Sequence, residues 1–493
     1  MIAVISVSVF MDLYIAMTHP PLHHDALLEK VIAAGQEHVY RFYDSLTEAD
    51  KEHLDAQVAA MDWELISKLV SDVVLRPVPF ELPRSIEPAP YLPNKPIDAA
   101  TQDIYARARH RGITLLRDGQ IAAFVVAGGQ GTRLGWPGPK GTFPATPVKK
   151  KPLFQCFVEY LRALEARHHT TIPFYIMTST ANHDATVDFF RRHDYFSMPE
   201  SQIMFFSQDM LPAVGFDGKV LLETPSSMAL SPNGHGGSLL ALHKSGALSD
   251  MRRRGVTQIS YFQVDNPIVR CVDPLFIGLH DIHEADMSSK MLPKAFGKEK
   301  LGNFCLVDGK IVVIEYSDLP EQLAEARQAD GELKFRAGSI ALHAVRRSFV
   351  EQLNAHGFAL PYHRAEKKVP HIDLHTGKPV NPASPNAVKM ETFVFDALPL
   401  ATKSIIYETG RIDEFAPIKN AEGVDSPASA ADIITRRSSQ WLAAAGIHVP
   451  KKPDGSPNAV IEISPSFAIY PEDVVDKYMQ VPPIAPGSQV YLP

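Results

Sequence analysis

The chain has 493 residues, too many for one ordinary hydrophobic core, and this length predicts two or three domains. Its 45% apolar and 21% charged residues are ordinary for a soluble globular protein, and its net charge of −7 argues against nucleic-acid or anionic-membrane partners. The three cysteines, Cys156, Cys271 and Cys305, lack zinc-ligand or CxxC spacing. We interpret them as reduced core residues of a cytoplasmic protein.

The first segment, Met1–Met17, is apolar but carries Asp12 and lacks a basic n-region. It is shorter than the ~20 residues that span a bilayer. A weak signal peptide stays open as an alternative. We favour a cytoplasmic protein whose translation starts at Met17.

The N-terminal region is predicted to be helical. Apolar residues three and four apart favour helices over Ala26–Leu46 and Thr47–Val74, and the second begins with a Thr-x-x-Asp helix-start pattern. The proline-rich run Arg76–Pro96 then breaks regular structure and indicates an extended linker. We expect residues 1–98 to form a helical N-terminal region with this linker.

The middle of the chain alternates between strand and helix patterns. A helix over Ala99–Leu116 leads into it. The expected strands are Ile121–Ala127, Phe174–Thr178, Met204–Ser207, Val220–Glu223 and Ile259–Val264, and the expected helices are Pro152–Arg167, Asn182–His193 and Ser238–Arg254. This alternation predicts a mostly parallel sheet with helices on both faces. Such sheets bind ligands beyond the carboxyl ends of their strands.

The pattern becomes mixed further along the chain. Asp308-Gly309 predicts a type I′ turn in a hairpin of Phe304–Val307 and Ile311–Glu315. A helix over Arg347–His356, a strand over Thr392–Phe395 and a helix over Ser429–Ala445 follow. We expect a catalytic domain over residues 99–412 and a small C-terminal domain over 413–493.

The segment Ala127–Gly135 (Ala-Gly-Gly-Gln-Gly-Thr-Arg-Leu-Gly) follows a buried strand and predicts a phosphate-binding loop. Its glycines let backbone N–H groups approach phosphate oxygens, and Arg133 and Lys140 add positive charge. The loop is not Walker A, because Trp136 follows the last glycine. It is not a dinucleotide-binding loop either, because the third glycine comes one residue too late.

The sequence resembles the UDP-sugar pyrophosphorylases, most closely the eukaryotic-type UDP-N-acetylglucosamine pyrophosphorylases. The resemblance spans roughly Ala99 to Ala445, in the family's order. The matching segments are Gly128–Gly135 with Pro139-Lys140-Gly141, Phe205–Pro212, Phe216–Lys219, Gln263–Asn266, Val313–Ser317, Lys389–Asp396 and Phe415–Ala421.

The resemblance implies an α/β fold of the Rossmann-like nucleotidyltransferase (GT-A-like) type, with a mixed sheet flanked by helices. It implies a uridylyltransferase that joins UTP to a hexose 1-phosphate and releases pyrophosphate, with Mg²⁺ as cofactor. The sugar phosphate is already anionic, so this reaction needs no general base and depends on positioning and charge stabilisation. A homo-oligomer stays open.

Nucleotide-binding roles follow from the same resemblance. Gly128 and Gly129 are implied to contact the uridine and phosphates, Gln208 to read the uracil edge, and Gly234 to lie against the base or sugar. Asp265 ends a buried strand at the sheet's carboxyl edge, which suits a carboxylate that binds the nucleotide's Mg²⁺. A turn at Asp265-Asn266-Pro267 is the alternative.

Cationic and sugar-binding roles complete the expected site. The catalytic cations are Arg133, Lys140 and Lys419, of which Lys419 is implied to contact the sugar's phosphate linkage. Lys389, placed before a short alternating strand, is implied to contact the nucleotide. The implied sugar contacts are His235, Glu315, Tyr316, Ser339, Phe393 and Phe395.

Two positions depart from the N-acetylglucosamine-type pattern. His235 and Ser339 stand where that family has asparagines, which weakens the case for an N-acetylhexosamine and leaves glucose and galactose 1-phosphate open. A UDP-sugar-using glycosyltransferase would show an Asp-x-Asp motif, but the chain has only Val-Asp-Asn-Pro after Gln263. A non-catalytic UDP-sugar sensor would not need this set of cations.

Overall fold

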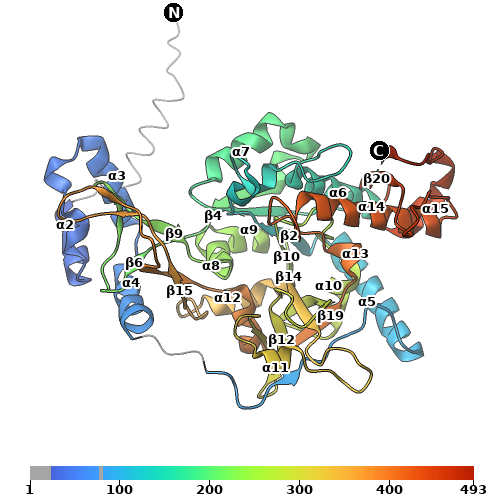
Figure 1. Ribbon diagram of the computed structural model, residues 1–493, viewed down its shortest axis with the longest axis horizontal. Coiled ribbons are helices and arrows are strands. Elements are labelled where there is room, and N and C mark those ends of the chain that lie inside the picture. Colours follow the sequence, from blue (N-terminus) through green and yellow to red (C-terminus); the bar gives the residue numbers. More distant parts are fainter. Residues whose placement is uncertain (1–23, 77–80) are drawn as a thin grey trace, which may run out of the picture. The chain divides into compact units, whose positions relative to one another are not determined.

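The computed structural model describes residues 24–76 and 81–493 of the chain (Figure 1). The predictions for Met1–Met17 lie outside the described residues. The chain divides into two compact units. Among the described residues, the smaller unit comprises 24–76, Met210–Gly234 and Tyr362–Thr392, and the larger comprises Glu81–Asp209, His235–Pro361 and Phe393–Pro493. The boundaries at residues 98 and 412 stay predictions.

A ten-stranded mixed sheet forms the centre of the larger unit, which confirms the predicted fold class. Its strands are β1 (Glu87–Pro88), β2 (Ile121–Val126), β3 (Phe174–Thr178), β4 (Ile203–Ser207), β10 (Gln258–Gln263), β11 (Met287–Pro293), β12 (Asn303–Val307), β13 (Lys310–Ile314), β14 (Ala337–Arg346) and β19 (Ser404–Glu408). The order is β1-β12-β14-β10-β2-β3-β4, with β11 beside β14 and β19, and β13 beside β12. β10, β2, β3 and β4 run parallel, whereas β14 is antiparallel to β10.

Strand β2 shows why this sheet has helices on both faces. Ala123 and Val125 join the hydrophobic cluster of α5 (Ala99–Arg117), α6 (Leu153–His168) and α10 (Pro274–Ile282). Phe124 and Val126 join the cluster of α8 (Gly237–Lys244), α9 (Ala247–Arg253) and α12 (Arg347–Leu353) on the other face (Figure 1). A strand buried on both faces must be continuously apolar, as this one is.

Several predicted helices are interrupted. The helix expected over Ala26–Leu46 ends early, as α2 (His24–Ala33), because Gly35 adopts a left-handed conformation at φ 69°. The helix expected over Thr47–Val74 is split into α3 (Glu48–Ala59) and α4 (Trp63–Leu69), with Asp62 capping the second. Gly246, at φ 80°, likewise separates α8 from α9. The predicted hairpin of β12 and β13 is confirmed, with Asp308 and Gly309 both at positive φ.

The strand predicted over Thr392–Phe395 is wrong. The strand lies upstream, as β18 (Ala387–Glu391), and a 3₁₀ helix, η8 (Val394–Leu400), follows it. Thr392 turns away from the ladder because its backbone N–H donates to Asn233 O at 2.8 Å. Lys389 therefore lies within a strand rather than before one.

The smaller unit combines helices with short strands. Helices α2, α3 and α4 share a hydrophobic core with a three-stranded sheet of β15 (His363–Lys367), β18 and β6 (Val214–Gly215). The strand expected over Val220–Glu223 is not part of the central sheet. It lies here as β7 (Leu222–Thr224), which pairs with β8 (Ser227–Met228).

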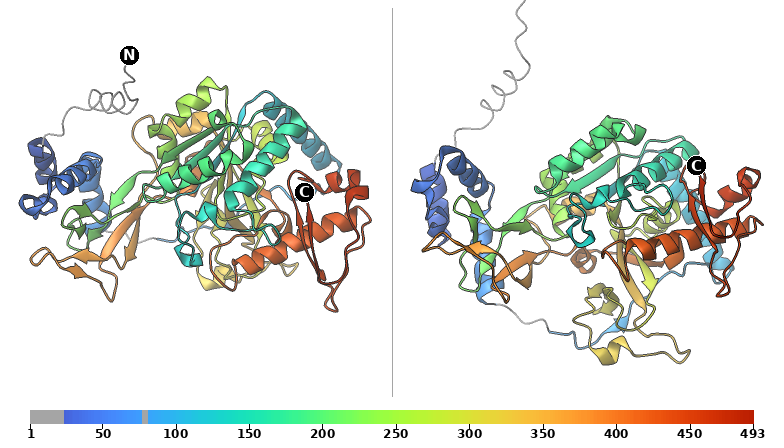
Figure 2. Two further views of the ribbon diagram at one scale, coloured as in Figure 1. Left: turned by 90° about the horizontal axis from the view of Figure 1, so that it is seen from above. Right: turned by 45° about the horizontal axis from the view of Figure 1, so that its top comes forward.

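The C-terminal segment has its own hydrophobic cluster within the larger unit. Helix α14 (Pro427–Ala444) packs on the parallel pair β20 (Ala459–Ile463) and β21 (Ser488–Leu492) (Figure 2). Glu462 joins this segment to the loop before α6, since its Oε2 accepts from Val148 N and Lys149 N at 2.8 Å. Among the described helices, none combines the length and apolar character that a membrane crossing requires.

Candidate active site

The glycine loop after β2 folds back on itself. Gly131 N donates to Gly138 O at 2.9 Å, and Lys140 N donates to Gly129 O at 3.0 Å. These two bonds place Lys140 beside Gly129, which lies eleven positions earlier in the chain. The predicted glycine loop and its lysine are thus one local structure.

Ser179 and Asn182, which sequence reasoning did not assign to the site, hold this loop. Ser179 Oγ donates to Gly128 O at 2.9 Å. Asn182 Nδ2 donates to Ala127 O at 3.0 Å and to Gly129 O at 3.2 Å, while its Oδ1 accepts from Ser179 N at 2.8 Å. Asn182 was predicted to begin a helix, and it does precede α7 (His183–Arg192), but its side chain binds the glycine loop instead of capping that helix.

Gln208 lies against Gly128 at the end of β4. Its Nε2 is 3.0 Å from the point where a Cβ on Gly128 would lie, so a side chain at that position would press on the amide. Gln208 is 7% exposed, and its Oε1 is buried without a hydrogen-bond partner among the described residues. A buried amide oxygen normally has a donor. Gln208 therefore offers a ready acceptor to a ligand N–H group.

The charges of four side chains act on Lys140. The fields of Asp265, Lys419, Arg133 and Asp425 all act on its ammonium group. Burial lowers the pKa of Lys140 from its ordinary value; Lys419 and Arg133 lower it further, and Asp265 and Asp425 oppose that change. The predicted catalytic cations and Asp265 are therefore near enough for their charges to act on Lys140.

Asp425 was missed by the sequence reasoning. Its carboxylate lies 3.6 Å from Lys419 Nζ, and its backbone oxygen accepts from Lys419 N at 2.6 Å. Asp425 lies six residues beyond Lys419 in a turn where it adopts φ 55°. A short charged turn of this kind gives no sequence signal that separates it from a solvated loop.

Asp265 follows β10 at the carboxyl edge of the parallel strands and is partly buried. Among the described residues, no group of three or more His, Cys, Asp or Glu side chains could hold a metal ion. Mg²⁺ commonly takes only one or two protein carboxylates and completes its shell with water and substrate phosphates. Asp265 fits that kind of site.

The predicted sugar-binding residues form two groups in the larger unit. The ring of His235 lies 5.4 Å from that of Phe393 and 5.6 Å from that of Phe395. His235 Nδ1 accepts from Val394 N at 3.1 Å, which holds the ring in one orientation and leaves Nε2 as its other polar atom.

Glu315 and Ser339 form the second group. Both lie around Gly302, where an added Cβ would be 3.3 Å from Glu315 Oε1 and 3.8 Å from Ser339 Cβ. Tyr316, in contrast, is 46% exposed.

Gly234 and Lys389 belong to the smaller unit. Gly234 adopts φ 83°, and a Cβ there would lie 2.4 Å from Thr392 O, so only glycine fits. Lys389 is partly buried in β18, opposite Ala365 of β15.

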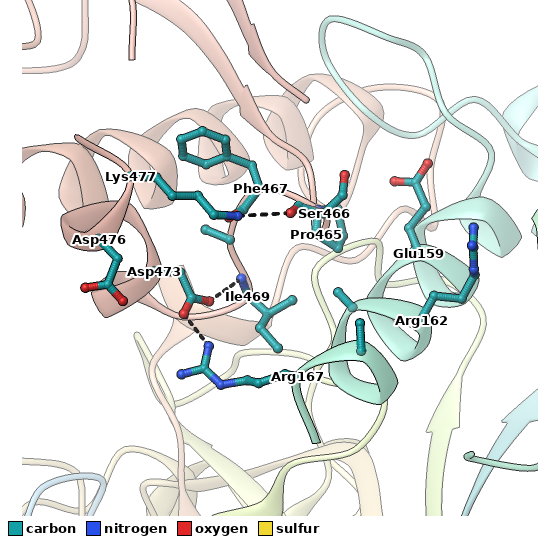
Figure 3. A pocket seen from close by; sticks show the side chains of 13 residues that line it. Glu159, Arg162, Arg167, Pro465, Ser466, Phe467, Ile469, Asp473, Asp476 and Lys477 are labelled. Atoms are coloured by element: carbon teal, nitrogen blue, oxygen red, sulfur yellow. Dashed lines mark hydrogen bonds and ion pairs between the residues drawn. The ribbon is translucent and has the colours of Figure 1, made fainter. Parts of the chain in front are cut away.

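A cavity of about 550 Å³ between α6 and the C-terminal segment is not this site (Figure 3). Several of its charged groups are already engaged: Arg167 pairs with Asp473, and Lys477 Nζ donates to Phe467 O at 2.6 Å. None of the residues that carry the family resemblance lines it.

The mixed sheet, with its glycine loop and clustered cations beyond the parallel strands, defines an α/β nucleotidyltransferase. The chain matches the family described as UTP–glucose-1-phosphate uridylyltransferase over residues 95–486, and it belongs to that family.

Relatives match most of the chain, and a solved structure has a similar fold. The chain is 36% identical over 475 residues to UDP-N-acetylhexosamine pyrophosphorylase-like protein 1 of Homo sapiens, covering 91% of this chain and 93% of that protein. It is 33% identical over 434 residues to the UDP-N-acetylglucosamine pyrophosphorylase of Saccharomyces cerevisiae, covering 84% and 90%. The uridine diphosphate N-acetylglucosamine pyrophosphorylase of Trypanosoma brucei, in complex with inhibitor, has a TM-score of 0.81 at 24% identity, covering 95% of this chain and 98% of that one. At that identity the likeness bears on the fold alone.

Proposed function

We propose that this chain transfers the uridylyl group of UTP to a hexose 1-phosphate, forming a UDP-sugar and pyrophosphate. The observation that supports the proposal is at Lys140, whose backbone N–H bonds to Gly129 of the glycine loop and on whose ammonium group the charges of Arg133, Lys419 and Asp265 act. Two anionic substrates repel each other, and clustered cations offset that repulsion where the two phosphates meet.

The reaction needs one bond to form and one to break. An oxygen of the sugar phosphate attacks the α-phosphorus of UTP, and the bond to the pyrophosphate oxygen breaks. Lys140, Arg133 and Lys419 stabilise the negative charge that develops on the phosphoryl oxygens. The glycine-loop N–H groups at Gly128 and Gly129 orient the nucleotide, and Lys389 is proposed to contact it. No protein side chain has to accept a proton.

Mg²⁺ is the proposed cofactor, with Asp265 as its protein ligand. When bound, the ion would neutralise phosphate charge and orient the triphosphate. We further propose that the protein is cytoplasmic and has no membrane or nucleic-acid partner.

The sugar is the open part of the proposal. His235, Glu315 and Ser339, with Phe393, Phe395 and Tyr316, are the proposed sugar contacts. Pyrophosphate release should be measured with UTP, Mg²⁺ and, in turn, N-acetylglucosamine, glucose and galactose 1-phosphate. We expect release with at least one of them. No release with any of the three would refute the proposed activity.

Gln208→Leu should raise the KM for UTP about tenfold while turnover changes by less than about threefold. The change removes both amide atoms at nearly constant volume, and one hydrogen bond to a ligand is worth on the order of 1 kcal/mol or more. Steady-state kinetics with UTP as the varied substrate would measure it. Gln102→Leu, on the exposed face of α5, is the matched control. An unchanged KM in Gln208→Leu would remove Gln208 from base recognition.

A further inference from the structure

A buried ion cluster lies next to the segment that carries Lys419. Lys290, in β11, is 2% exposed, and its Nζ donates to Asp273 Oδ2 and to both carboxylate oxygens of Glu414 at 2.7 Å. Glu414, the last residue of α13 (Arg411–Glu414), is fully buried and also accepts from Thr409 Oγ1 at 2.9 Å. A buried carboxylate with this many donors has a tightly defined position.

Asn266 joins that cluster to the segment after β10 that carries Asp265. Its Nδ2 donates to Glu414 O at 2.6 Å, and its Oδ1 accepts from Ala416 N at 3.1 Å. Ile418 N then donates to Asp265 O at 2.8 Å. Three hydrogen bonds therefore fix residues 414–418 to the end of β10, and Lys419 is the next residue.

We propose that Asn266 and Glu414 are positioning residues that set Lys419 relative to Asp265, which deepens the function proposed above and rests on it. Both amide atoms of Asn266 are engaged, and its side chain is 4% exposed. It is therefore a clamp between two chain segments rather than a second metal ligand beside Asp265. A displacement of about 1 Å at a reacting site can cost about 100-fold in rate, so a clamp outside the site can control turnover.

The charge of Asp273 in the buried cluster supports this role. Although burial acts to raise it, the pKa of Asp273 lies well below its ordinary range because of the positive charges of Lys290 and Arg270. Asp273 is thus a carboxylate at neutral pH, and Lys290 Nζ, which donates to it, also donates to Glu414.

A double-mutant cycle tests the clamp. Asn266→Ala and Glu414→Gln should each lower kcat by about 10- to 100-fold, with the KM for UTP within about threefold of wild type. In a Lys419→Ala background, the same two changes should lower kcat by less than about threefold, because the group that they position is gone. In a Gln208→Leu background, they should keep their full effect.

Two further measurements keep the result interpretable. Asn354→Ala removes another buried asparagine, which bonds to Val350 O at 2.8 Å, and should leave kcat within about threefold. Glu414→Gln retains an acceptor for Thr409 and carries the test if Asn266→Ala does not fold. An equal fractional loss with and without Lys419 would mean a merely structural role and overturn the clamp. Normal kcat in both single variants would also overturn it, whereas an inactive wild type would overturn the proposed function itself.

Discussion

Lys140→Met should lower turnover about 100-fold while leaving the melting temperature unchanged or raised. Lys140 is partly buried, and the charges of Asp265, Lys419 and Arg133 act on its ammonium group, which is proposed to contact a phosphoryl oxygen. Loss of one such donor commonly costs about 100- to 1,000-fold in rate. Burial lowers the pKa of Lys140, which means that the folded state disfavours the charged amine. Methionine removes that cost at similar length, so stability should not fall.

The lowered pKa of Lys140 also predicts how turnover depends on pH. Because the pKa of Lys140 is below its ordinary value of 10.5, the ammonium loses its proton earlier than a surface lysine as the pH rises. Turnover should therefore decline on the alkaline side below pH 10.5. Lys95→Met, at an exposed position, is the control and should behave as wild type. Retention of turnover in Lys140→Met would remove this lysine from the mechanism.

Asp265→Asn should lower turnover about 100-fold and raise the Mg²⁺ concentration needed for half-maximal rate about tenfold. Asparagine keeps the size of the side chain, and the bond from Ile418 N goes to the backbone oxygen of residue 265, so the fold should persist. Kinetics over a Mg²⁺ titration, with melting curves beside them, would measure both effects. Asp118→Asn, at an exposed position after α5, is the matched control.

An unchanged Mg²⁺ requirement in Asp265→Asn would argue against Asp265 as the metal ligand.

The sheet could be predicted because its local signals agree with its tertiary environment. Ile121–Val126 and Phe174–Thr178 are continuously apolar and are buried on both faces, so the pattern alone indicates parallel strands. The glycine loop and Asp265 were predictable for the same reason, since each directly follows such a strand. The antiparallel β14 was not evident, because its pairing with β10 depends on contacts far apart in sequence.

The supporting residues of the site could not be predicted from the sequence. Asn182, Asn266 and Glu414 act through bonds to segments 53 to 150 residues away, and nothing in their own neighbourhoods marks them. The error at Thr392 has the same cause, since Asn233 takes its N–H out of the predicted ladder. The break after α2, in contrast, had a local signal in Gly35 that the apolar periodicity outweighed.

The bonds from Ser179 and Asn182 have a thermodynamic consequence for nucleotide capture. They hold the glycine loop in shape with protein groups alone, so a ligand does not have to freeze the loop when it arrives. Ordering a free backbone would cost about 1–2 kcal/mol per residue, and this cost is met during folding instead. Association should therefore be governed by encounter and charge rather than by a slow loop rearrangement.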